Sequence, residues 1–250
     1  MDFDRLITQA QSMEFAGWDF SVFGDRFTDP EPSWSYRQVV SGLMGSATAV
    51  LDMGTGGGEL LAELLPVDAR VCATEGYPPN LPVARERLEP LGVSVSATHT
   101  ENNEDLPFGD GLFDLVINRH ESFDAGELAR VMAPGGRFVT QQIGGRYMLD
   151  LNEALGGPLP DYADWDLKTA TAQLADVGFT IAESREEFGD CVFTDIGAVV
   201  MYLRIVSWQV PDFTVEAYRD SLMRLHERME RDGAVRFRGH GFLLQAVAPL

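Results

Sequence analysis

Residues 47–65 read ATAVLDMGTGGGELLAELL, and this stretch contains the pattern that decides the fold. Ala47–Met53 is an apolar run of strand length, and four of the next five residues are glycine. Gly58–Leu65 then carries apolar residues at helical spacing until Pro66 ends the pattern. A buried strand that turns tightly into a helix is the first half of a βαβ unit. The stretch therefore predicts a parallel sheet with a glycine turn at the carboxyl end of one strand.

The alternation of strand and helix continues toward the carboxyl terminus. Together with 47–53, the predicted strands cover residues 70–74, 93–97, 113–118, 137–142, 179–183 and 241–248. The predicted helices cover residues 80–91, 126–132, 167–177, 196–207 and 214–231. We expect an α/β fold, Rossmann-like, with about seven strands and helices on both faces of the sheet. Residues 1–45 are expected to form an N-terminal helical cover on a domain of residues 46–250, all in a single compact unit.

Composition limits the classes of function. The chain has 250 residues, of which 45% are apolar, and 39 acidic against 19 basic side chains give a net charge of −20. A polyanion gains nothing from releasing the counterions of another polyanion, so nucleic acid and anionic membranes are disfavoured partners. Two cysteines are too few for a disulfide framework, and neither an export signal nor a membrane-spanning apolar run is visible. We expect a cytoplasmic protein.

The glycine turn indicates a ligand that touches backbone. The dinucleotide pattern G-x-G-x-x-G would require glycine where Glu59 stands, and a carboxylate there would repel a pyrophosphate. The chain instead matches D-x-G-x-G-x-G from Asp52, whose carboxylate can accept hydrogen bonds from an ammonium group. Glu75 lies 23 residues beyond Asp52, where an acidic side chain can meet a ribose diol. Together these residues favour a nucleoside that also carries an amino-acid end.

At this point the chain resembles the class I S-adenosylmethionine-dependent methyltransferases. The resemblance rests on three blocks in a fixed order: Leu51–Gly58 (LDMGTGGG), Leu106–Val116 (LPFGDGLFDLV) and Leu128–Phe138 (LARVMAPGGRF). They look like the glycine motif of that family, its L-P-F-x-D-x-x-F-D run before strand four, and its L-x-R-V-L-x-P-G-G run before strand five. The resemblance implies S-adenosylmethionine as cofactor and a seven-stranded sheet whose last strand is antiparallel.

The same resemblance implies the cofactor contacts. Asp52 and the glycines would hold the amino-acid end, Glu75 the ribose hydroxyls, and Asn118 would contact the cofactor through its backbone. The family usually has an aspartate for the adenine amine where this chain has Asn103, whose amide oxygen can still accept, although Glu104 or Asp105 could do so instead. The complete set of expected cofactor contacts is Asp52, Gly54, Thr55, Gly56, Gly58, Glu75, Gly76, Asn103, Glu104 and Asn118.

His120 is the candidate catalytic residue. It follows predicted strand four, at the edge where the reactive methyl group should point, and a histidine can take the proton that a hydroxyl or ammonium acceptor must lose. The alternative is that His120 orients a loop, perhaps paired with Glu121. Gln141 and Gln142 could hydrogen-bond an acceptor, although capping or loop roles are as plausible. Aromatic residues that could cover an organic substrate or belong to the core are Trp18, Phe20, Phe23, Trp34, Tyr36, Tyr147 and Trp165.

These observations favour a methyltransferase that acts on an oxygen or nitrogen atom of a small molecule. An RNA-base methyltransferase is the alternative enzyme, and its only support is a cluster of arginines at 224–238 interleaved with acidic residues. A third hypothesis is a protein that binds the cofactor without turnover. The histidines and cysteines lack metal-ligand spacing, so no metal site is expected.

Overall fold

The computed structural model describes residues 2–15, 20–98 and 103–250, so Trp18 lies outside the described residues. The chain divides into two compact units. The helical unit comprises Met1–Pro32, Gly144–Trp165 and Glu187–His240. The glycine-turn unit comprises Ser33–Ile143, Asp166–Glu186 and Gly241–Leu250. Each unit is described by itself.

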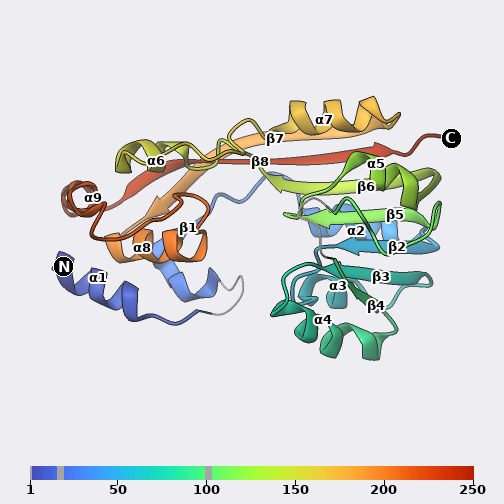
Figure 1. Ribbon diagram of the computed structural model, residues 1–250, viewed down its shortest axis with the longest axis horizontal. Helices are drawn as coiled ribbons and strands as arrows, with labels where there is room; N and C mark the ends of the chain where they lie inside the picture. Colours follow the sequence, from blue (N-terminus) through green and yellow to red (C-terminus); the bar gives the residue numbers. More distant parts are fainter. Residues whose placement is uncertain (1, 16–19, 99–102) are drawn as a thin grey trace. The chain divides into compact units, whose positions relative to one another are not determined.

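The glycine-turn unit is built on a mostly parallel sheet with the strand order β7-β8-β6-β5-β2-β3-β4 (Figure 1). Neighbours from β6 to β4 are parallel, whereas β8 runs antiparallel to β6. The α/β prediction and the antiparallel last strand are therefore confirmed. The strands are β2 (Ala49–Met53), β3 (Arg70–Glu75), β4 (Ser94–Ala97), β5 (Phe113–Arg119), β6 (Met132–Ile143), β7 (Thr180–Phe193) and β8 (Val235–Val247).

Alternation along the strands gives each face of this sheet an apolar surface. Val50, Leu115 and Val139 lie in one buried cluster with side chains of α2, α3 and α4. Figure 1 shows α3 and α4 beside β3 and β4. Intervening residues such as Phe138 face the other side, where the ring of Phe123 packs at a centroid distance of 5.0 Å. The helices of this unit are α2 (Tyr36–Met44), α3 (Glu59–Leu64), α4 (Asn80–Leu88), the 3₁₀ turn η2 (Glu89–Leu91), α5 (Ala125–Val131) and α7 (Leu167–Asp176).

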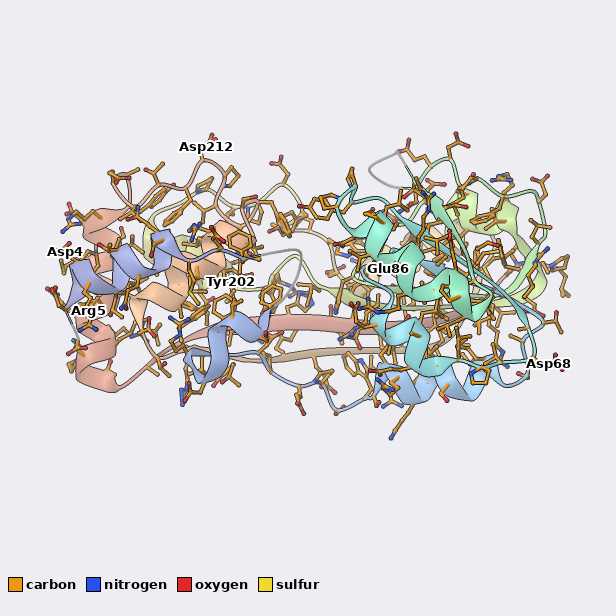
Figure 2. All side chains as sticks on the ribbon, turned by 90° about the horizontal axis from the view of Figure 1, so that it is seen from below. Asp4, Arg5, Asp68, Glu86, Tyr202 and Asp212 are labelled. Atoms are coloured by element: carbon orange, nitrogen blue, oxygen red, sulfur yellow. The ribbon has the colours of Figure 1, made fainter. Side chains whose placement is uncertain are left out.

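The helical unit buries a separate apolar cluster around α8. Figure 2 shows Tyr202 of α8 among the packed side chains, whereas Asp4 and Arg5 point outward from α1. The pattern of α1 explains this, because its buried residues recur at helical spacing and its charged residues lie between them. The elements are α1 (Phe3–Ser12), η1 (Phe20–Arg26), β1 (Phe27–Thr28), α6 (Leu149–Leu155), α8 (Ile196–Ile205) and α9 (Arg219–Asp232).

The structure differs from the sequence prediction in strand number and in boundaries. The described residues contain eight strands rather than seven, because Phe27–Thr28 pairs with the end of β7. Two residues are too few to show a period-two pattern, so β1 could not be predicted. The predicted N-terminal cover also divides, since α2 packs with the strands of the glycine-turn unit and residues before Ser33 belong to the helical unit. The predicted strands 179–183 and 241–248 are parts of the longer strands β7 and β8, each of which continues from one unit into the other.

Among the described residues, no helix is both long enough and apolar enough to cross a membrane.

Candidate functional site

The glycine turn joins β2 to α3 and is fastened to the neighbouring strand β3. Gly54, Gly56 and Gly58 all have positive φ, at 65°, 63° and 82°. The backbone N–H of Thr55 donates to the Thr74 carbonyl at 2.9 Å, and the N–H of Gly54 lies 3.3 Å from the Thr74 hydroxyl. The turn therefore has one fixed path at the carboxyl edge of the parallel sheet, where α/β proteins bind their ligands.

Asp52 is a buried carboxylate directly before this turn, with 9% of its surface exposed. Burial raises its pKa to about 7, the nearby Thr55 side chain lowers it by less, and the Glu75 carboxylate raises it further. The groups that act on Asp52 include no cation. An ammonium ligand would stabilise the ionised form of such a buried carboxylate, because it would replace the hydration lost on burial.

Glu75 ends β3, next to β2, and is 5% exposed. Burial raises its pKa although its carboxylate accepts hydrogen bonds from the backbone N–H groups of Tyr77, Gly56 and Gly76. The bond from Tyr77 measures 2.7 Å. Asp52 and Glu75, the two predicted acids, thus lie at the ends of adjacent strands. The predicted contact residue Gly76 donates its backbone N–H to Glu75.

Asn103 is almost fully buried, and its amide orientation is fixed by its partners. Its Nδ2 donates to Glu121 Oε1 at 2.9 Å and to the Ser122 carbonyl at 3.0 Å. Both amide protons are therefore used, and Oδ1 is left as an acceptor with no partner. This oxygen is the atom that the sequence predicts as the acceptor for the adenine amine. Glu104 and Asp105, the alternatives, are both exposed.

Glu121 is the residue whose place the sequence did not reveal. A Cβ atom added at Gly54 would lie 2.6 Å from Glu121 Oε2, so this side chain lies directly against the glycine turn. Burial raises the pKa of Glu121, the hydrogen bond from Asn103 lowers it, and Glu75 raises it. The sequence suggested a pair with His120, but the Glu121 carboxylate instead accepts a hydrogen bond from Asn103. No sequence spacing connects two loop residues 18 positions apart.

Asn118 at the end of β5 is oriented by residues of β6. Its Oδ1 accepts from the Thr140 hydroxyl at 2.9 Å and from Gln142 Nε2 at 2.8 Å, and Gln142 also donates to the Glu121 carbonyl at 2.8 Å. The Nδ2 of Asn118 is buried with no partner. The sequence predicted a backbone contact to the cofactor, and the structure adds a side-chain donor that is held in place.

His120 follows β5 with φ of 63°, a left-handed conformation that histidine adopts more readily than most residues. Its backbone N–H donates to the Gln141 carbonyl at 2.8 Å, which holds it beside β6. His120 is exposed, and the protein around the ring and the charge of Arg119 lower its pKa from 6.5 to about 4. This shift favours the neutral imidazole at pH 7.

Four buried side-chain atoms of the described residues lack a hydrogen-bond partner, and all four belong to this region: Tyr36 Oη, Thr55 Oγ1, Asn103 Oδ1 and Asn118 Nδ2. Tyr36 lies close enough to Asp52 and Arg119 for both charges to affect its pKa, which burial raises. Buried polar atoms without partners are rare in folded proteins and cost about 1–3 kcal/mol each. Their gathering beside Asp52 and Glu75 fits a polar ligand with donors and acceptors.

The remaining predicted aromatic residues fall in the helical unit. Phe23 and Tyr147 belong to its buried cluster, and the Tyr147 hydroxyl donates to Asp29 at 2.6 Å. Phe20 is partly exposed on η1, and Trp165 accepts a backbone hydrogen bond within the same unit. Trp34 and Tyr36 are the two that the structure places in the glycine-turn unit.

Residues 51–140 match the model of a family described as methyltransferase domain. The matched segment contains the glycine turn, both acids, Asn103, Asn118 and His120. A curated relative, the demethylmenaquinone methyltransferase of Thermus thermophilus, is 36% identical over 116 residues, which cover 42% of this chain and 52% of the relative. The ubiquinone biosynthesis O-methyltransferase of Cereibacter sphaeroides is 33% identical over 82 residues, or 33% of each chain. The chain thus spans about half or less of these relatives.

The solved structures show the same fold over more of the chain. A protein of Bacillus halodurans C-125 described as a methyltransferase aligns with a TM-score of 0.59, covers 86% of this chain and 97% of its own, and is 20% identical. This likeness shows the Rossmann-like fold. The family whose model matches residues 51–140 and both curated relatives are described as methyltransferases.

Proposed function

We propose that this protein is an S-adenosylmethionine-dependent methyltransferase that transfers a methyl group to an oxygen or nitrogen atom of a small molecule. The observation that carries the proposal is the group of unpartnered polar atoms beside two buried acids at the glycine turn. S-adenosylmethionine has an ammonium group, a ribose diol and an adenine amine, and it carries no phosphate. Each of these three groups can donate hydrogen bonds, and the site offers an acceptor for each of them.

The proposed contacts follow from the chemistry of each side chain. Asp52 would hold the ammonium group, Glu75 the ribose hydroxyls, and Asn103 Oδ1 the adenine amine. Thr55 Oγ1 and Asn118 Nδ2 are further polar atoms for the amino-acid end of the ligand. When bound, the cofactor would supply a methyl group already activated on a sulfonium. The protein then needs only to hold the acceptor atom in line with that methyl group and exclude competing water.

The acceptor would lie near His120, at the carboxyl end of β5. The names of the two curated relatives refer to quinones, which supports a small organic acceptor. The arginine cluster at 224–238 gives little support to RNA, because three of its five members pair with acids: Arg228 and Arg231 with Asp232, and Arg236 with Asp190. With a net charge of −20, the chain offers little to a phosphate backbone.

Calorimetric titration with S-adenosylhomocysteine and an assay of isotope-labelled methyl transfer together test the proposal. We expect saturable binding, and incorporation of label into a small-molecule extract in excess of incorporation into total RNA. The absence of heat and of any thermal shift in folded protein would contradict the cofactor assignment. Greater labelling of RNA would favour the alternative enzyme, and binding without turnover on either substrate would favour a protein that only binds the cofactor.

A double mutation tests the assignment of Asn103. The family usually has aspartate at this position, but in this chain Asn103→Asp would place a carboxylate against Glu121 and the Ser122 carbonyl, with no proton between them. We expect the single change to weaken S-adenosylhomocysteine binding about tenfold or more, because two carboxylates cannot share this position. Glu121→Gln supplies the missing donor, so the double variant should recover most of the affinity.

Calorimetry on the two single variants and the double variant completes the cycle. The coupling energy between the positions should exceed about 1 kcal/mol. Glu121→Gln alone is the matched control, since its amide oxygen can still accept from Asn103. Additive effects of the two changes would show that the pair does not orient the adenine acceptor.

A further inference from the structure

A chain of hydrogen-bonding side chains leads from the buried residue Trp34 to His120 within the glycine-turn unit. Trp34 is 7% exposed, and its Nε1 donates to Gln141 Oε1 at 2.8 Å. The Nε2 of Gln141 lies 3.5 Å from His120 Nε2, a long contact at the outer limit of a hydrogen bond. Trp34 precedes α2, Gln141 is in β6, and His120 follows β5. None of these contacts is needed to form the sheet.

The chemistry of the three side chains determines which of them donates and which accepts at each hydrogen bond. An indole N–H can only donate, so the Gln141 atom that meets Trp34 must be the amide oxygen. The amide nitrogen, which can only donate, therefore faces His120. A ring nitrogen that receives a donor must offer its lone pair, and in a neutral imidazole the proton then resides on the other nitrogen. The Trp34 indole thus determines the tautomer of His120, although the two side chains interact only through Gln141.

We propose that Trp34 and Gln141 are positioning residues that fix His120 in its Nδ1–H tautomer, so that the ring donates a hydrogen bond to an oxygen atom of the methyl acceptor. This role differs from the general base that the sequence suggested, because the Nε2 lone pair already faces the Gln141 amide. It specifies the acceptor as a molecule whose oxygen has a free lone pair, such as a phenolate, enolate or carbonyl oxygen. The identity of that ligand rests on the proposed function, whereas the tautomer does not.

The charges around the ring agree with a neutral donor. Arg119 is the charged group whose field acts on His120, and Gln141 and Trp34 are both uncharged. A proton on Nε2 would point at the amide N–H of Gln141, which is an unfavourable arrangement of two donors. Both effects oppose formation of an imidazolium ion.

Nitrogen-15 NMR of the histidine rings tests the proposal on the 250-residue chain. The signal of His120 among the four histidines is identified by its loss in His120→Asn, a change that keeps a residue tolerant of positive φ. We expect the wild-type ring to show protonation at Nδ1 and to remain neutral down to about pH 5. Trp34→Phe removes the donor to Oε1, so the amide can turn, and a shift of the proton toward Nε2 is expected.

Gln141→Glu gives the sharper readout. The new carboxylate can accept from Trp34 and also from a protonated Nε2, so the pKa of His120 should rise by one unit or more, a tenfold gain in proton affinity. Gln38→Glu, which adds the same charge at an exposed position of α2, should leave it unchanged.

Three results would overturn the proposal: protonation of wild-type His120 at Nε2, a tautomer that is the same in Trp34→Phe, or a pKa that is the same in Gln141→Glu. Titration of the same labelled sample with S-adenosylhomocysteine reports separately on the cofactor site. A protein that fails to bind it but keeps the Nδ1–H tautomer would contradict the proposed function and leave the positioning chain intact.

Discussion

Asp52→Asn should greatly weaken S-adenosylhomocysteine binding and at the same time stabilise the unliganded protein. The carboxylate is the proposed partner of the ammonium group, and loss of one member of a buried charged pair costs about 2–5 kcal/mol. We therefore expect affinity to fall about a hundredfold or more. Because asparagine keeps the shape of the side chain, the change removes the charge and little else.

The stabilisation follows from the pKa of Asp52, about 7 in the folded chain against 3.8 for an ordinary aspartate. Between these values the folded state holds a proton that the unfolded chain has lost, so the free energy of unfolding falls as the pH rises through this window. The cost is complete above about pH 7 and amounts to roughly 4 kcal/mol at most. Asp52→Asn should recover much of it at pH 8, and less than about 2 kcal/mol at pH 5.

Calorimetry and urea unfolding at several pH values measure both effects. In the wild type, binding should weaken as the pH falls below about 7, since the ligand must meet an ionised Asp52, and Asp52→Asn should lose this dependence. Equal affinity of the variant and the wild type would show that Asp52 does not hold the ligand.

Asp114→Asn is the matched control, at the opposite end of the same sheet. Burial alone would raise the pKa of Asp114, but hydrogen bonds from Thr48 and Ala49 lower it below 3.8. Its ionised form therefore stabilises the fold above that pH, and this contribution is lost as the pH falls through the lowered pKa. Asp114→Asn should therefore reduce the free energy of unfolding at pH 8 and leave S-adenosylhomocysteine binding intact.

The sequence predicted the parts of the site that lie on regular elements. Asp52, the glycine turn and Glu75 follow from strand patterns and spacing, because parallel strands bring their carboxyl ends to one edge. Asn103 was identified through a family motif, and its Oδ1 is a buried acceptor without a partner, which supports the proposed contact with the adenine amine.

The parts that escaped prediction depend on contacts made by loops. Glu121 lies against Gly54, and Trp34 reaches Gln141 across 107 positions of sequence. No periodicity encodes such contacts, since each depends on the path of at least one irregular segment. The division of the chain into two units escaped for a similar reason: β7 and β8 are continuous strands that carry no boundary signal.

A pair of alanine substitutions in the glycine turn should separate ligand contact from folding. Gly56 and Gly58 both have positive φ, so alanine at either position pays about the same backbone strain, roughly 1 kcal/mol. Their surroundings differ. A Cβ atom at Gly56 meets nothing within 4 Å, whereas one at Gly58 would lie 2.7 Å from Cγ of the buried Leu88.

Gly56→Ala should therefore fold nearly normally, with a loss of about 2–4 °C in Tm, and should bind S-adenosylhomocysteine at least a hundredfold more weakly. The added methyl group projects into the open space over which the ligand is proposed to lie. Gly58→Ala should instead lower stability by about 2–4 kcal/mol, because Leu88 must shift within a packed core. Its folded fraction should bind with an affinity much closer to that of the wild type.

Differential scanning calorimetry and ligand titration on both variants give the two readouts. Gly56→Ala should mainly lose affinity and Gly58→Ala should mainly lose stability. A general weakening of the turn would not produce this difference between the two variants. If Gly56→Ala binds as tightly as the wild type, the ligand does not pass over this glycine. If Gly58→Ala loses affinity without losing stability, the contact with Leu88 is not what requires a glycine there, and the position belongs to the ligand-binding surface itself.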